Sequence, residues 1–67
     1  MKEKQKNIEP LAVGTEEAAM LLSISRPQIY KMLASREIAS FHIGTRRLIP
    51  VDTIREYIRS KIAEEKK

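Results

Sequence analysis

The feature that most constrains the fold is a helix start that follows the end of another helix almost directly. Ser25 to Gln28 has the form of a capping box, in which Ser25 caps the helix and Gln28 reaches back to it. Pro27 falls in the first turn, where its missing amide hydrogen costs nothing. We expect residues 15–22 to form the preceding helix, capped by Thr15. Two short helices joined by so tight a turn predict a helix-turn-helix.

Small and apolar residues stand where the two helices must touch. Ala19 is small at the expected crossing, and Ile24, Ile29 and Met32 supply the apolar contacts. Ser23 occupies the turn, where a left-handed backbone would cost serine on the order of 1 kcal/mol. These positions together favour the helix-turn-helix over the alternative, a generic helical hairpin within another small fold.

After the second helix the apolar period changes from helical to alternating. Residues 38–43 and 47–49 are prone to form strands, and they flank a turn signal at Gly44. Pro50 then stops the return strand. A last helix is expected from about residue 51, with one buried stripe made by Val51, Ile54, Tyr57, Ile58 and Ile62. The expected fold is mainly α with a small β-hairpin: a winged helix-turn-helix with a two-stranded antiparallel wing and a C-terminal helix.

The length of 67 residues accommodates one domain, which we place at residues 11–62. Residues 1–10 are expected to be a disordered basic lead-in, and residues 63–67 a charged tail. The chain has no cysteine, which excludes disulfides and thiolate metal sites. No apolar run is long enough to span a bilayer. We therefore expect a cytoplasmic, soluble protein with no membrane partner.

The formal net charge of +4 suits a nucleic-acid partner, although ordinary solubility charge explains it equally well. The arrangement of the charges is more informative. If Ile29 points inward, Lys31 lies on the outward face of the second helix, and Gln28 and Tyr30 flank that face. In a helix-turn-helix this face enters the major groove of double-stranded DNA. The candidate contacts on this helix are Ser25, Arg26, Pro27, Gln28, Tyr30 and Lys31.

The residues leave several of these roles open. Gln28 either contacts a base edge or only caps the helix, and Lys31 suits either base edges or phosphates. Arg26 and Tyr30 are better placed for phosphates, and for Tyr30 partial core packing is the alternative. Arg36, at the end of the helix, compensates the helix dipole or contacts DNA.

The expected hairpin tip carries Thr45, Arg46 and Arg47, which we assign to the adjacent minor groove. The alternative is a solvated pair of turn charges. His42 has no acid or cysteine at ligand spacing, so we interpret it as a surface residue near phosphate rather than a catalytic or metal-binding group. The sequence contains no nucleophile–base pair, phosphate loop or metal cluster, so we expect no enzyme, no cofactor and no small-molecule substrate.

Four segments together resemble the excisionase-like and MerR-like winged helix-turn-helix domains. They are Thr15-Glu16-Glu17-Ala18-Ala19, Leu22-Ser23-Ile24-Ser25-Arg26, Ile29-Tyr30-Lys31 and Ile43-Gly44-Thr45-Arg46-Arg47-Leu48-Ile49-Pro50. The resemblance implies a recognition helix in the major groove and a wing in the minor groove, with DNA contacts from the residues named above. The family pattern usually has a glycine between the recognition helix and the next strand, where this chain has Arg36-Glu37.

The chain resembles the stand-alone members of this family, which are excisionases and small phage or mobile-element regulators. The resemblance implies an accessory factor that binds and bends DNA at the ends of a mobile genetic element, with a site-specific integrase and neighbouring copies of itself as partners. A transcriptional regulator with the same fold is the alternative, because both use one surface. A protein-interaction module is a third possibility, and we find no exposed apolar patch outside the expected core stripes to support it.

Overall fold

The computed structural model describes residues 9–66 and has the expected element order with one additional strand. The elements are β1 (Ala12–Gly14), α2 (Thr15–Leu22), α3 (Arg26–Ala34), β2 (Phe41–Ile43), β3 (Arg46–Pro50) and α4 (Val51–Glu65). The basic lead-in expected over residues 1–10 lies almost wholly outside the described part of the chain, as does Lys67 at the end of the expected charged tail. The fold is three helices around a small antiparallel sheet.

The sheet has three strands rather than the two expected for the wing. The strand order is β1-β3-β2, and both pairings are antiparallel. Val13 of β1 lies opposite Ile49 of β3, and the Val51 amide donates to the Leu11 carbonyl at 2.9 Å. The additional strand ties the start of α2 to the base of the hairpin, so the helix-turn-helix and the wing share one frame.

The turn between α2 and α3 adopts the left-handed backbone considered for Ser23. Ser23 has a φ of 59°, and the Ile24 amide donates to the Ala19 carbonyl at 2.9 Å. The expectation for the start of α2 is wrong, because Gly14 rather than Thr15 is the N-cap residue. Gly14 still belongs to the extended β1 strand, so the helix begins directly at Thr15 and the threonine side chain is not in a capping position.

The core lies where α2, α3 and the first half of α4 meet the sheet. Ile29 of α3 and Ile49 of β3 are fully buried at its centre. The other buried side chains are those of Val13, Ala18, Ala19, Met32, Leu33, Ile38 and Ile54. Ala18 and Ala19 let α3 approach α2 closely, as expected for a helix-turn-helix. Burial of one large aliphatic side chain contributes about 1.5–3 kcal/mol, so these few residues dominate the stability of the domain.

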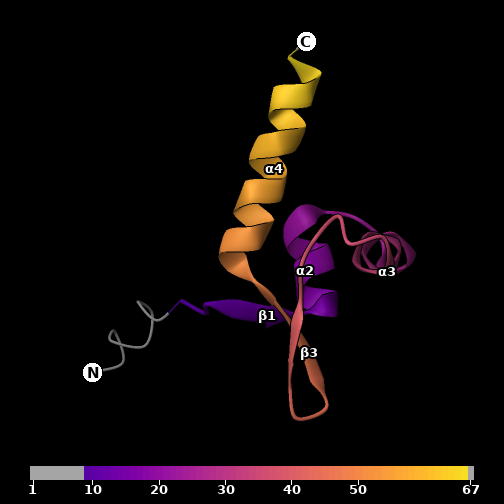
Figure 1. Ribbon diagram of the computed structural model, residues 1–67, viewed down its shortest axis with the longest axis vertical. Helices are drawn as coiled ribbons and strands as arrows, with labels where there is room; N and C mark the ends of the chain where they lie inside the picture. The colour runs from indigo at the N-terminus through magenta and orange to yellow at the C-terminus, as the bar shows by residue number, and fades with distance from the viewer. Residues whose placement is uncertain (1–8, 67) are drawn as a thin grey trace.

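Helix α4 begins at Val51 as expected and continues to Glu65, past the residue at which the charged tail was placed. Its second half projects away from the other elements, at the opposite end of the molecule from the hairpin (Figure 1). The prediction of one buried stripe is therefore only partly right. Ile54 is buried, but Ile58 is 39% exposed and Ile62 is 54% exposed, because no other element extends that far. Within residues 9–66, no helix is both long enough and apolar enough to cross a membrane.

Candidate nucleic-acid interface

The start of α3 is organised by Ser25. Its side-chain oxygen accepts a hydrogen bond from the Gln28 amide at 3.3 Å, which confirms the predicted cap. Pro27 lies in the first turn, also as predicted. This cap satisfies one of the free amides at the helix start and fixes the direction in which the first turn of α3 emerges. Ser25, Arg26 and Pro27 are all exposed at this end of the helix.

The outward face of α3 is exposed along its length. Lys31 and Ala34 lie on it beyond Pro27, opposite the buried Ile29 and Leu33. The described part of the chain shows no carboxylate in an ion pair with Lys31. The face is therefore exposed and carries the positive charge of Lys31, which suits insertion into the major groove.

One flank of this face contacts the first turn of α2. The Tyr30 hydroxyl lies 3.3 Å from the Thr15 hydroxyl, and the tyrosine is 48% exposed. Arg26, four residues earlier on α3, forms an ion pair with Glu16 at 3.3 Å. Two consecutive residues of α2 thus contact Arg26 and Tyr30, which are candidate phosphate contacts one turn apart on α3. Sequence reasoning missed both contacts, since a pairing between side chains of two helices depends on how the helices cross.

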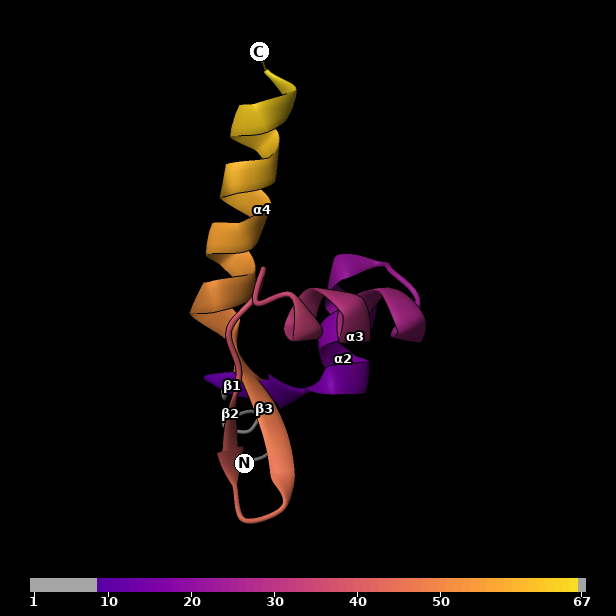
Figure 2. The same ribbon diagram turned by 45° about the vertical axis from the view of Figure 1, so that its right-hand side comes forward.

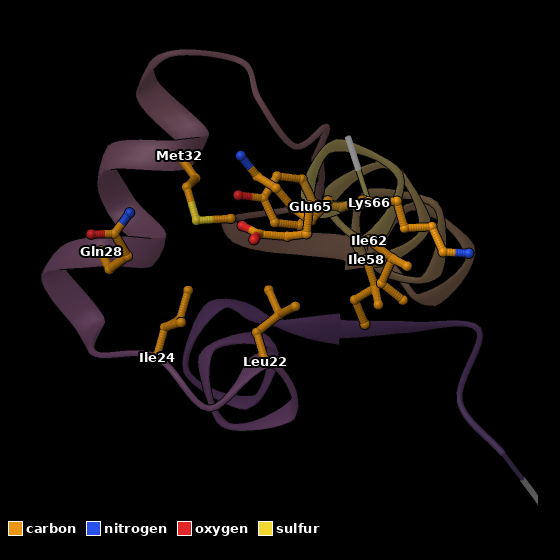
Figure 3. Close-up of a pocket in the computed structure, with 10 residues that line it drawn as sticks. Leu22, Ile24, Gln28, Met32, Ile58, Ile62, Glu65 and Lys66 are labelled. Carbon is orange, nitrogen blue, oxygen red and sulfur yellow. The ribbon is translucent and has the colours of Figure 1, made fainter.

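Gln28 lies on the opposite flank, toward α4. It borders an open groove of about 540 Å³ between α3 and α4, together with Met32 of α3 and Ile24 of the turn (Figure 3). Leu22, Tyr57, Ile58 and Ile62 supply most of the remaining apolar lining, with Lys61, Glu65 and Lys66 at the far end. Gln28 is exposed, so its side chain has access both to this groove and to a ligand in front of α3. The two predicted roles of Gln28 remain predictions.

The hairpin differs in detail from the expected tip. The strand pairing begins at Phe41, and Ile43 lies opposite Arg46, so the connection consists only of Gly44 and Thr45. Gly44 has a φ of 63°, the positive value expected of a glycine in so short a turn. Thr45 is exposed at the tip, as predicted.

The two arginines lie in β3 rather than at the tip, and strand alternation sends their side chains to opposite faces. The Arg46 guanidinium lies beside Gly14, where an added Cβ would approach it to 3.2 Å. Arg47 is half-buried, and its Nε donates to the Ser40 hydroxyl at 3.0 Å. The expectation that both arginines lie at the hairpin tip is therefore wrong: Arg46 is exposed at the start of β3, and Arg47 is half-buried and hydrogen-bonded to Ser40.

The described residues contain no cluster of three or more His, Cys, Asp or Glu side chains that could hold a metal ion. Basic groups lie on α3, at its C-terminal end and on the hairpin, and α4 carries a further set made of Arg55, Arg59 and Lys61. The first set belongs to α3 and the hairpin. Figure 2 shows these two elements as separate projections from the same core. This arrangement leaves α3 free to enter a major groove, the docking geometry of helix-turn-helix proteins.

Comparison with known proteins agrees with this geometry. A family model described as a helix-turn-helix domain matches residues 13–62, which include every element from β1 to most of α4. The chain is also 26% identical to a protein named "Excisionase" from Streptomyces ambofaciens over 57 residues, covering 85% of this chain and 92% of that protein. No solved structure matches the chain significantly. The match over most of the chain shows that it belongs to the helix-turn-helix domain family, whose members bind DNA.

Proposed function

We propose that this protein is an excisionase-type accessory factor that binds specific double-stranded DNA sites and bends them at the ends of a mobile element. The observation that carries the DNA-binding part is the exposed basic face of α3 beside a hairpin with two arginines on one rigid frame. The excisionase part rests on the similarity to the Streptomyces ambofaciens protein over most of both chains. The role is one of binding rather than catalysis, and its proposed location is the cytoplasm, where DNA is found.

In the proposed complex, α3 enters the major groove with the side chains of its first two turns. Ser25, Arg26, Pro27, Gln28, Tyr30 and Lys31 supply these contacts. The hairpin lies along the adjacent minor groove, with Thr45 at its tip and Arg46 and Arg47 near its end. Phosphate contacts would set the register, and contacts from Gln28 or Lys31 to base edges would select the sequence.

Substitution separates these contributions. If Gln28 contacts a base, Gln28→Ala relaxes discrimination at one base pair by about 1–3 kcal/mol. If Gln28 only caps the helix, the variant has a lower melting temperature, and its affinity falls by the same factor at every DNA site. Lys31→Ala, acting on phosphate, weakens all sites and leaves the melting temperature unchanged. Equal melting temperatures and unchanged site preference in both variants would count against α3 as the recognition helix.

A site-specific integrase and neighbouring copies of this chain are the proposed protein partners. The exposed apolar groove between α3 and α4 supports contact between copies on adjacent sites, since burial of the exposed Ile58 and Ile62 side chains by a neighbouring copy would be favourable. Binding to duplexes with one site and with two sites tests this: Ile62→Lys should reduce cooperativity and leave single-site affinity intact. Unchanged cooperativity in that variant would remove the groove from the proposal.

The second candidate function, a small transcriptional regulator, uses the same surface on different DNA. Footprinting on the DNA that flanks the gene distinguishes the two functions. Protection at the end of a mobile element, together with stimulated excision by the neighbouring integrase, is the expected result. Protection confined to a promoter, without an effect on recombination, would favour the regulator.

A further inference from the structure

A cleft of about 330 Å³ lies between the C-terminal end of α3 and the inner face of the hairpin. Its lining is formed by Leu33, Arg36, Ile38, Ala39, Ser40, His42 and Arg47. The cleft separates the two elements proposed to enter neighbouring grooves of DNA. A phosphodiester backbone always runs between a major groove and the adjacent minor groove, so a duplex bound to both elements would present phosphates here.

The polar lining of this cleft is basic. Arg36 follows α3, His42 lies on β2, and Arg47 lies directly opposite His42 on β3. Directly opposed residues of paired strands project on the same face, so His42 and Arg47 both face the cleft. No acidic residue lines the cleft. Three different segments of the chain therefore bring cationic or protonatable groups to one place.

Arg47 is held in a way that suits an anion. Its Nε donates to the Ser40 hydroxyl, and this leaves the terminal nitrogens of the guanidinium for another acceptor. Among residues 9–66, Arg47 forms no ion pair. Arg47 also borders a surface hollow that contains Glu16 and Glu17, but it forms no ion pair with either, so its guanidinium is available to an anion.

Arg36 adopts a backbone conformation that favours glycine, with a φ of 65°. This conformation ends α3, and the Glu37 amide donates to the Met32 carbonyl at 2.9 Å. Arg36 also borders a second cleft that contains Glu37 and Glu56, but it forms no ion pair with either within the described residues. Glu37 instead accepts a hydrogen bond from the Ser35 hydroxyl at 3.1 Å. The guanidinium of Arg36 is thus not neutralised by the acids nearest to it.

We propose that Arg36, His42 and Arg47 form a phosphate-binding site between the recognition helix and the wing. The inference rests on the proposed DNA-binding function, and it joins Arg36 and His42, which were considered separately above, to Arg47 in one site. The ligand chemistry is a phosphate oxygen, supplied by the DNA backbone; free inorganic phosphate is the other source. The His42 ring adds a hydrogen-bond donor, and the charged groups that share its cleft are Arg36 and Arg47.

The test measures the affinity of the whole chain for a short duplex of arbitrary sequence, across a salt series. Arg36→Ala should weaken binding by about tenfold at low salt, as expected for one charge-assisted contact, and reduce the magnitude of the salt slope by about 1. The matched control is Arg59→Ala, because Arg59 is an exposed arginine on α4 that borders Asp52, Thr53 and Glu56 instead. Equal effects of the two substitutions would overturn the site.

A substitution of His42 provides a second readout. His42→Ala should weaken binding to the same duplex by about threefold, as expected for the loss of one hydrogen bond. An affinity equal to that of the wild type would exclude His42 from the site.

Inorganic phosphate alone tests the cleft separately from DNA binding. Titration followed by NMR should shift the signals of the His42 ring and the Arg47 guanidinium before those of Arg59. If phosphate shifts these signals while the wild type does not bind any duplex, the proposed DNA function fails and the anion site stands. If the duplex binds but phosphate leaves both signals unchanged and Arg36→Ala binds normally, the site fails and the DNA function stands.

Discussion

Arg36 allows a prediction in which stability and binding change in opposite directions. Its φ of 65° places the Cβ close to the following carbonyl oxygen, which costs a non-glycine residue about 1–2 kcal/mol. Glycine removes this cost, but it also makes the unfolded chain more flexible, which lowers the stability of the fold by about 0.4–1 kcal/mol. Arg36→Gly should therefore stabilise the fold by about 0.5–1 kcal/mol. For a domain of this size, that raises Tm by roughly 2–8 °C.

Thermal denaturation followed by circular dichroism measures the change, and fluorescence anisotropy measures duplex binding. Arg36→Ala is the matched control, because alanine keeps the Cβ and its strain while losing the guanidinium. Both variants should bind a duplex less tightly by the same factor, but only Arg36→Gly should melt at a higher temperature. A lower Tm for Arg36→Gly, or an equal rise in both variants, would refute the argument from backbone strain.

Three further substitutions test other parts of the structure. Ser25→Ala removes the cap on the Gln28 amide and should destabilise the fold by about 1 kcal/mol in urea denaturation, and an unchanged midpoint would contradict the role of the cap. Ile29→Ala truncates a fully buried side chain and should cost about 2–5 kcal/mol, enough to remove much of the helical dichroism of so small a domain. Glu16→Gln frees Arg26 and should raise affinity for an arbitrary duplex more than Glu17→Gln, which removes the same charge without breaking an ion pair. Because the Glu16–Arg26 pair is exposed, the difference between the two variants should stay below about fivefold. Equal affinities would show that this ion pair does not compete with DNA.

The parts of this fold that could be predicted depend on residues close together in the chain. The cap at Ser25, the left-handed turn at Ser23 and the positive φ of Gly44 each follow from local backbone chemistry. The apolar spacing of α3 likewise identified Ile29 and Met32 as buried contacts, and Leu33 is buried beside them. Short-range rules of this kind were sufficient to place α3 and its buried face.

The parts that were missed depend on contacts between distant segments. Strand β1 has three residues, too few for a periodic pattern, and it exists only because β3 pairs with it. The periodicity of α4 predicted an apolar stripe but not how far along the helix other elements cover it. The opposite placement of Arg46 and Arg47 arises because β3 begins at Arg46, one residue before the strand expected from the sequence, so both arginines lie in the strand.

The salt dependence of duplex binding tests the central claim most directly. If about five of the basic groups on α3, the hairpin and the segments around them neutralise phosphates, log affinity should fall with log salt concentration at a slope of about −4 to −5. The slope should become less steep by about 1 in Lys31→Ala and in Arg46→Ala, and stay unchanged in Arg59→Ala. A wild-type slope near zero, or equal slopes in all four proteins, would contradict the claim that α3 and the wing form a DNA-binding surface.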